Sequence, residues 1–250
     1  MGAESATPPR PARRGAGARD AVVWAPMSAP VVVSDMDGTL ATYPWRAVLG
    51  WIREHHPSPA ARRFVVVRLP RVVLAATGRL DREAFRIGWM ADQARLLRDL
   101  PEARLTEMAE WVVEHHLWPG RRQVAIDAVM AAAAAARATY PGSRLLLATG
   151  AYRQLGEAFG RRIGADVALG TPLEVREGVA TGALSGPTQN SEAKAAAVAE
   201  EAAGSEVLAA FGDSYADIPL LRLAVRAVAV APDAGLRREA QLRGWEILEG

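Results

Sequence analysis

The stretch that most constrains the fold of this chain is residues 31–40, which read VVVSDMDGTL. The β-branched run predicts a short buried strand, and the Asp, Gly and Thr residues that follow predict a turn at its carboxyl end. In open α/β sheets, ligands bind in the crevice outside the carboxyl ends of the strands. Asp35 and Asp37 are therefore candidate functional residues, although an ordinary Asp/Gly turn would look the same in isolation.

The rest of the chain predicts further strands that alternate with helices. Short apolar runs at residues 143–149, 166–169, 207–211 and 227–230 predict buried strands, and the segments between them have helical periodicity. This alternation indicates an α/β fold with a doubly wound parallel sheet. Residues 172–184 differ, because their glycine turn signals predict a β-hairpin.

Composition divides the chain into a tail, a core and an insertion. Residues 1–30 are rich in Ala, Gly, Pro and Arg, so we expect a disordered tail. Residues 41–140 have a helical pattern, which predicts an all-helical cap domain inserted directly after the first core strand. Residues 31–40 and 141–250 then form the α/β core.

Charge and cysteine content exclude several classes of partner and chemistry. The formal net charge is +2 and no segment interleaves basic with aromatic residues, so we expect no nucleic-acid partner. The absence of cysteine excludes disulfides and thiolate catalysis, and the tail has no apolar run of signal-peptide length. We therefore expect a cytoplasmic protein, either a monomer or a homodimer. The apolar run at residues 64–76 is too short to cross a bilayer, so membrane contact is not expected, with a helix lying on a membrane as the alternative.

Polar side chains follow three of the predicted strands and begin one helix. Because the carboxyl ends of parallel strands lie at one edge of a sheet, these groups can share a single crevice. Lys194 is the one lysine among 30 basic residues, which indicates that a compact ammonium is needed where a guanidinium would not serve. The groups concerned are Asp35 with Asp37, Thr149 with Gly150, Lys194, and Asp213 with Asp217.

These motifs, in this order, resemble those of the haloacid dehalogenase (HAD) superfamily. The shared pattern is Asp-x-Asp-Gly-Thr, a strand ending in Thr, a lone Lys, and Gly-Asp-Ser-x-x-x-Asp, and it extends over residues 31–230. The helical insertion after the first motif is similar to the C1 cap of the phosphoserine-phosphatase-like branch, subfamily IB. The resemblance implies a Rossmann-like core and a Mg²⁺-dependent phosphatase that acts through an aspartyl-phosphate.

The resemblance also implies catalytic roles for individual residues. Asp35 resembles the nucleophile and Asp37 the general acid and base, and phosphoryl transfer does need a nucleophile, neutralisation of charge and a proton for the leaving group. Thr149 and Lys194 would hold the phosphoryl oxygens. The further residues expected around the phosphate are Gly38, Thr39 and Gly150.

Mg²⁺ is the cofactor that the resemblance implies. Its expected protein ligands are Asp35, Asp213 and the backbone carbonyl of Asp37, and Asp217 would support or join them. Carboxylate and carbonyl oxygens in a chain without cysteine suit this hard cation.

The reaction is better defined by the sequence than the substrate, which we expect to be a small phosphorylated metabolite. Substrate contacts are expected from the cap, where Arg46 is a candidate. The loop in which phosphoserine phosphatase recognises the amino-acid end with an Asn reads Gly170-Thr171 here, so phosphoserine itself is in doubt. The alternatives are a phosphomutase or another phosphotransferase on the same fold, and a lipid-phosphate phosphatase.

Overall fold

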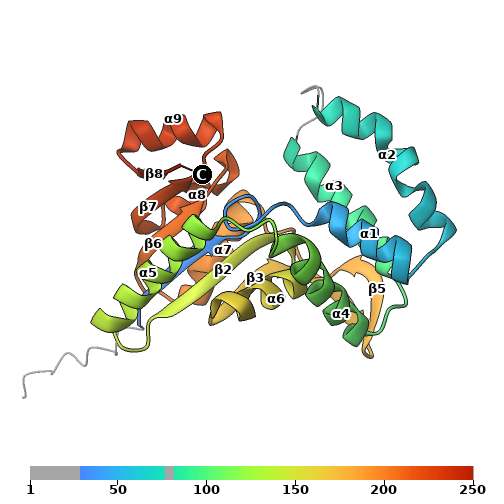
Figure 1. Cartoon of the computed structure of the whole chain (residues 1–250), viewed down its shortest axis with the longest axis horizontal. Helices are drawn as coiled ribbons and strands as arrows, with labels where there is room; N and C mark the ends of the chain where they lie inside the picture. The colour runs from blue at the N-terminus through green and yellow to red at the C-terminus, as the bar shows by residue number, and fades with distance from the viewer. Residues whose placement is uncertain (1–28, 77–81, 250) are drawn as a thin grey trace, which may run out of the picture.

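The computed structural model describes residues 29–76 and 82–249. Its centre is a six-stranded sheet with the strand order β3-β2-β1-β6-β7-β8, in which every neighbouring pair is parallel (Figure 1). The strands are β1 (Val31–Asp35), β2 (Arg144–Tyr152), β3 (Val167–Thr171), β6 (Val207–Gly212), β7 (Ala224–Val230) and β8 (Glu246–Leu248).

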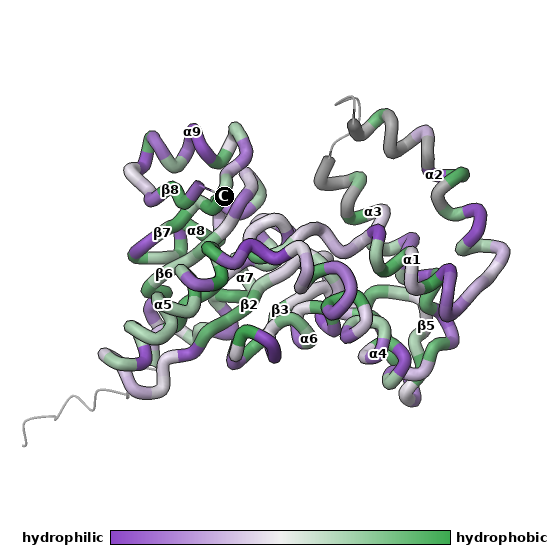
Figure 2. Tube along the Cα trace, in the orientation of Figure 1, coloured by the Kyte–Doolittle hydropathy of each residue, from purple (hydrophilic) through white to green (hydrophobic). Residues whose placement is uncertain are grey.

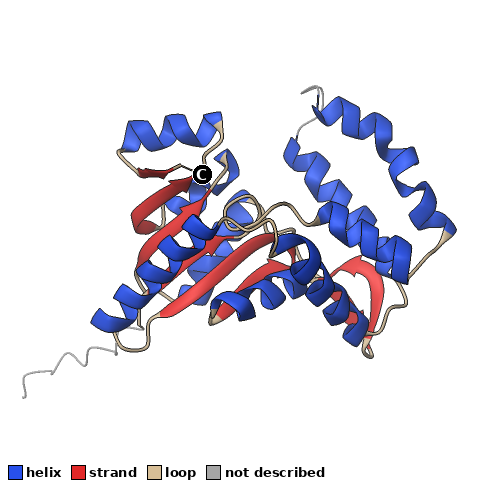
Figure 3. Cartoon of the chain, in the orientation of Figure 1, coloured by secondary structure: helices blue, strands red, loops and turns tan. Residues whose placement is uncertain are grey.

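Helices cover both faces of this sheet, as the alternation in the sequence predicts (Figure 3). The side chains of Val31 and Val33 pack into one core cluster and that of Val32 into the other, because successive side chains of a strand point to opposite faces. Figure 2 shows the apolar residues concentrated along the strands, which are buried on both sides. One face carries α5 (Gln123–Thr139) and α6 (Arg153–Ile163), and the other carries α7 (Ser191–Ala202), α8 (Ile218–Leu221) and α9 (Ala234–Arg243).

The helical insertion lies beside the carboxyl edge of the sheet. Helix α4 packs against α6 of the core through the ion pair Arg161–Glu110, and the ion pair Arg162–Glu114 joins α6 to the turn that follows α4. Figure 1 shows α1, α2 and α3 farther from the sheet. The elements of the insertion are α1 (Trp45–His55), α2 (Pro59–Ala76), α3 (Arg82–Ala94), the short helix η1 (Arg95–Leu97), α4 (Glu102–Val112) and the π-helical turn η2 (Val113–Leu117).

The predicted hairpin forms as β4 (Leu173–Arg176) and β5 (Val179–Leu184), and it braces the insertion. The Asp99 amide donates to the Ala180 carbonyl at 2.9 Å, and the Ala180 amide donates to the Leu100 carbonyl at 2.8 Å. The core therefore supports the insertion through the hairpin as well as through α6.

Helix α5 packs on the sheet, although the sequence pattern places it inside the predicted cap of residues 41–140. Its neighbours are β1, β2 and β6. The chain leaves the core after Leu40 and returns at Arg122, whose backbone amide donates to the Leu40 carbonyl at 2.8 Å. We therefore propose an insertion of residues 41–121, with α5 assigned to the core.

Three further expectations concern the N-terminal tail, membrane contact, and the location and oligomeric state of the protein. Residues 1–28 of the predicted tail are outside the described residues. Within the described part of the chain, no helix has the length and apolar character needed to cross a membrane. The cytoplasmic location and the monomeric or homodimeric state stay predictions from the sequence.

Candidate active site

The predicted groups converge at the carboxyl edge of the sheet, where β1 and β6 end and the neighbouring β2 continues to Tyr152. Strand β1 ends at Asp35, which is in register with Ala148 of β2, so Thr149 lies one residue farther along the neighbouring strand. On the other side of β1, strand β6 ends at Gly212 and Asp213 follows. Lys194 lies on α7, which packs against β2 and β3. Sequence spacing alone predicts this meeting of strand ends, and the structure confirms it.

Lys194 joins two buried carboxylates. Its ammonium lies 2.5 Å from Asp35 Oδ1 and 2.8 Å from Asp217 Oδ1. All three residues are buried, with exposed fractions of 6% for Lys194, 1% for Asp35 and 2% for Asp217. Burial opposes the charged ammonium, but the two carboxylates outweigh burial and hold the pKa of Lys194 above its usual value, so the lysine stays charged.

Asp217 is fully engaged by the protein. Besides the bond to Lys194, its Oδ2 accepts hydrogen bonds from the Ser214 amide at 3.1 Å and the Ser214 hydroxyl at 2.8 Å. Burial would raise its pKa, but Lys194 and the hydrogen bonds hold the pKa of Asp217 below its usual value. Both oxygens therefore have partners already, and Asp217 is built to position Lys194 and the loop after β6.

Asp37 has one bonded and one unpaired oxygen. Its Oδ2 accepts hydrogen bonds from the Thr149 hydroxyl at 2.5 Å and from the Ala151 amide at 3.1 Å. Its Oδ1 is buried and has no hydrogen-bond partner among the described residues. Burial raises the pKa of Asp37 more than these bonds lower it, but the pKa of Asp35 is raised as well, so the unpaired oxygen is what distinguishes Asp37.

Asp35 and Asp213 share a hydroxyl between them. The Thr39 hydroxyl lies 2.8 Å from Asp35 Oδ2 and 3.1 Å from Asp213 Oδ1. Burial, followed by the charge of Asp217, raises the pKa of Asp213 to about 6. Burial and the neighbouring carboxylates likewise raise the pKa of Asp35, against the opposing effect of Lys194.

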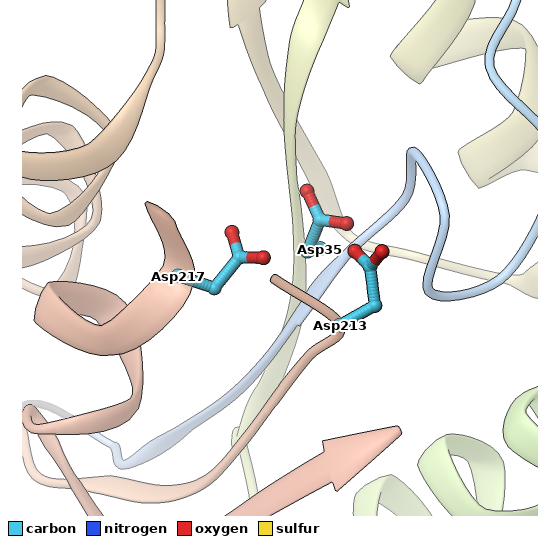
Figure 4. A group of neighbouring side chains, drawn as sticks. All are labelled: Asp35, Asp213 and Asp217. Carbon is cyan, nitrogen blue, oxygen red and sulfur yellow. The ribbon is translucent and has the colours of Figure 1, made fainter. Parts of the chain in front are cut away.

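The carboxylates fit the divalent cation that the sequence resemblance implies. Oxygen atoms of Asp35, Asp213 and Asp217 all lie within 4.8 Å of one another, and Figure 4 shows their side chains turned toward a common space. Together with Asp37 they place four carboxyl groups around one lysine, an excess of negative charge that a hard cation would neutralise. Each of these carboxylates also accepts hydrogen bonds within the protein, Asp35 from Lys194 and Thr39, Asp213 from Thr39, and Asp217 from Lys194 and Ser214.

Gly38 makes this close approach possible. Its φ of +94° lies in the region that favours glycine, and a Cβ there would lie 2.3 Å from Asp213 Oδ2. The Arg122 side chain fixes the same turn by donating from Nε to the Gly38 carbonyl at 3.0 Å. Gly150 is also constrained, because a Cβ there would lie 2.8 Å from Asn190 Oδ1.

A cavity of about 890 Å³ opens beside these groups, between the core and the insertion. Arg46, the predicted cap contact, is not among its lining residues; it is exposed, and its guanidinium lies over the Trp45 ring at 4.9 Å. Sequence reasoning missed Asn190 and Tyr215, which do line the cavity. Asn190 had a detectable signal, because Asn directly before a predicted helix is a preferred N-cap residue.

The fold and this site define a class: capped α/β proteins that carry an aspartate-rich centre at the carboxyl edge of a parallel sheet. The family model of the haloacid dehalogenase-like hydrolases matches residues 32–222. The chain belongs to that family.

Relatives within the family carry phosphatase names. The chain is 34% identical over 148 residues to phosphoserine phosphatase SerB1 of Mycobacterium tuberculosis, a match that covers 56% of this chain and 44% of the relative. It thus spans less than half of that relative. It is 31% identical over 180 residues to histidinol-phosphatase of Neisseria meningitidis, covering 68% of this chain and 76% of the relative.

A solved structure shares the fold. A Bordetella pertussis protein of unknown function superimposes with a TM-score of 0.70 at 23% identity, covering 88% of this chain and 98% of that one. Because it covers 88% of this chain, the likeness extends over the sheet and into the insertion.

Proposed function

We propose that the protein is a Mg²⁺-dependent phosphatase that hydrolyses a small phosphomonoester through an aspartyl-phosphate on Asp35. The observation that carries the proposal is the contrast between two carboxyls two residues apart. Asp35 is paired with a charged lysine at 2.5 Å, whereas Asp37 accepts hydrogen bonds on Oδ2 only and has a buried Oδ1 without a partner among the described residues. One carboxyl is thus kept available as a nucleophile and the other as an acid.

In the first step, an oxygen of Asp35 bonds to phosphorus while the bond from phosphorus to the leaving oxygen breaks. The proton on Asp37 passes to that leaving oxygen, which departs as an alcohol. In the second step, Asp37 accepts a proton from the attacking water, phosphate is released and Asp35 returns to its carboxylate form. The Thr149 hydroxyl donates a hydrogen bond to Asp37 Oδ2 at 2.5 Å. The other oxygen, Oδ1, therefore remains available to exchange a proton with the substrate.

Charge neutralisation comes from two sources in this proposal. Lys194 is buried beside the nucleophile and is positioned by Asp217, so its ammonium offsets the charge of the phosphoryl oxygens. Mg²⁺ would be held by Asp35, Asp213 and the backbone carbonyl of Asp37. When bound, the ion supplies further positive charge to the phosphoryl oxygens.

The direct test is release of inorganic phosphate from p-nitrophenyl phosphate, with and without Mg²⁺. We expect release that requires Mg²⁺ and disappears in Asp35→Asn, while the exposed control Asp127→Asn keeps wild-type activity. Release by the wild-type protein in the presence of a chelator would contradict the metal requirement. Equal release by Asp35→Asn would contradict the nucleophile. Measuring phosphate itself also distinguishes hydrolysis from transfer to a second hydroxyl group.

A further inference from the structure

We propose that the cavity beside the acidic centre selects phosphomonoesters whose leaving group is a bulky, uncharged, apolar alcohol. The proposal rests on the proposed phosphatase activity and names its class of substrate. It is carried by the contrast between the two walls of the cavity.

Among the described residues, the wall formed by the core is charged and the wall formed by the insertion is not. All the charged residues that line the cavity lie on the core side, namely Asp35, Asp37, Lys194, Asp213, Asp217 and Asp233. On the other side, the lining residues from the described part of the insertion are aromatic, aliphatic or neutral. They are Tyr43, Pro44, Trp45, Val48, Phe85, Trp89, Met90 and Gln93, and Leu155 of α6 extends this apolar surface.

An aromatic cluster gives the apolar wall its shape. Trp89 is 7% exposed, and its ring meets that of Trp45 edge-on at a centroid distance of 5.0 Å and that of Phe64 at 4.9 Å. Phe85 adds a third contact at 5.8 Å. Such edge-to-face arrangements are favourable in themselves, so the wall is preformed for a ligand.

Two polar side chains beside this wall are engaged within the protein, whereas the buried Trp89 Nε1 has no hydrogen-bond partner among the described residues. Gln93 is 1% exposed, and its side-chain amide donates to the Trp45 carbonyl at 3.0 Å. The Tyr152 hydroxyl of β2 donates to the Met90 carbonyl at 3.0 Å and so ties α3 to the core. Gln93 and Tyr152 thus hold the wall in place, and the polar groups left on it are neutral.

A charged leaving group would find no opposite charge among the described residues of this wall. Arg46 lies over the Trp45 ring and does not line the cavity, and Arg68 is paired with Asp92. Burying the carboxylate or ammonium of an amino-acid alcohol against aromatic rings carries a desolvation cost without compensation. Each methylene group of the ligand that becomes buried, in contrast, raises the binding affinity by about fourfold.

The test compares the kcat/KM values of methyl, butyl and octyl phosphate with those of 1-naphthyl phosphate, phosphoserine and histidinol phosphate. We expect kcat/KM to rise about fourfold for each methylene group that enters the cavity, and octyl phosphate to exceed both amino-acid esters by at least 100-fold. Comparison of octyl with naphthyl phosphate tells whether the natural leaving group is aliphatic or aromatic. Equal values for methyl and octyl phosphate, or a preference for either amino-acid ester, would overturn the proposal.

Two half-buried tryptophans provide a matched pair of variants. Trp45→Ala removes part of the wall, whereas Trp111→Ala removes a ring that contacts histidines elsewhere in the insertion. We expect Trp45→Ala to lower kcat/KM at least tenfold for octyl phosphate and less than threefold for methyl phosphate, with Trp111→Ala unchanged on both. In addition, Met90→Arg, which places a cation on the wall, should raise the relative rate with phosphoserine. Circular dichroism checks that each variant is folded.

A binding measurement separates failure of this proposal from failure of the proposed phosphatase. If none of the esters releases phosphate, the phosphatase assignment fails, and octylphosphonate and methylphosphonate are then titrated by calorimetry. Octylphosphonate binding at least 100-fold more tightly, with the difference reduced in Trp45→Ala, would support the apolar site on its own. Equal affinity for the two phosphonates would overturn it.

Discussion

The Lys194 ammonium lies 2.5 Å from Asp35 Oδ1, although 159 positions separate the two residues in the chain. Both side chains are buried, so their attraction is only weakly screened by water. This is also the one lysine of a chain in which every other basic side chain is arginine. A compact charge fits between Asp35 and Asp217, whereas the wider guanidinium group does not.

The first prediction concerns this choice of cation. Lys194→Arg should lower kcat by at least about 100-fold, because the guanidinium displaces the Asp35 carboxylate from its position. The measurement is phosphate release at saturating substrate. The reverse exchange at a surface pair, Arg222→Lys opposite Glu239, provides the control and should leave kcat within about twofold of wild type. Near-normal turnover by Lys194→Arg would mean that any positive charge suffices.

A second prediction separates catalysis from folding at the nucleophile. Asp35→Asn should lower kcat by roughly 10⁴-fold, because the amide has a similar shape but is a poor nucleophile. Its Tm should equal or exceed that of the wild type measured without Mg²⁺, since the substitution removes a buried carboxylate whose pKa is raised. A fall in Tm of more than a few degrees would show that Asp35 stabilises the fold.

The sequence predicts what depends on local pattern, and the structure adds what depends on distant contacts. The strands and their polar ends follow from short apolar runs and the parallel topology, which is why Asp35, Thr149 and Asp213 could be grouped in advance. Helix α5 could not be assigned, because an alanine-rich helix has the same pattern in a cap as in a core. Only the hydrogen bond from Arg122 to Leu40 shows where the chain returns to the sheet.

The roles of individual side chains were harder to predict than their positions. Asp217 lies one helical turn after Asp213, and that spacing suits a metal ligand as well as a supporting residue. Ser214 and Lys194 take both oxygens of Asp217, which supports the second role, but Lys194 and Thr39 likewise take both oxygens of Asp35. Arg46 lies in the expected element, but its side chain packs over Trp45, and sequence periodicity does not specify that direction.

The third prediction tests whether Asp213 binds Mg²⁺ while Asp217 stabilises the fold. Asp213→Asn should raise the Mg²⁺ concentration needed for half-maximal activity by at least about tenfold, because the variant loses a charged ligand. Asp217→Asn should instead lower the free energy of unfolding by about 2 kcal/mol, since the pKa of Asp217, unlike that of Asp35, is held below its usual value, so its ionised form stabilises the fold beside Lys194. Metal titrations and urea denaturation measure the two effects. Equal metal dependence of the two variants would contradict the assignment.

The last prediction concerns Gly38, where conformation and space act together. The control is Gly164, which follows α6 and has a φ of +66°. A Cβ added at Gly164 would point into open space, whereas a Cβ added at Gly38 would meet the Asp213 carboxylate. Gly164→Ala should cost only the backbone strain of about 1 kcal/mol and leave kcat unchanged. Gly38→Ala bears a comparable strain and must also displace Asp213, because its new Cβ would lie 2.3 Å from Oδ2. We therefore expect a larger loss of stability for Gly38→Ala, together with a loss of activity that added Mg²⁺ only partly restores. If both variants lost the same stability and Gly38→Ala kept its activity, the turn would not be what holds Asp213 in the site.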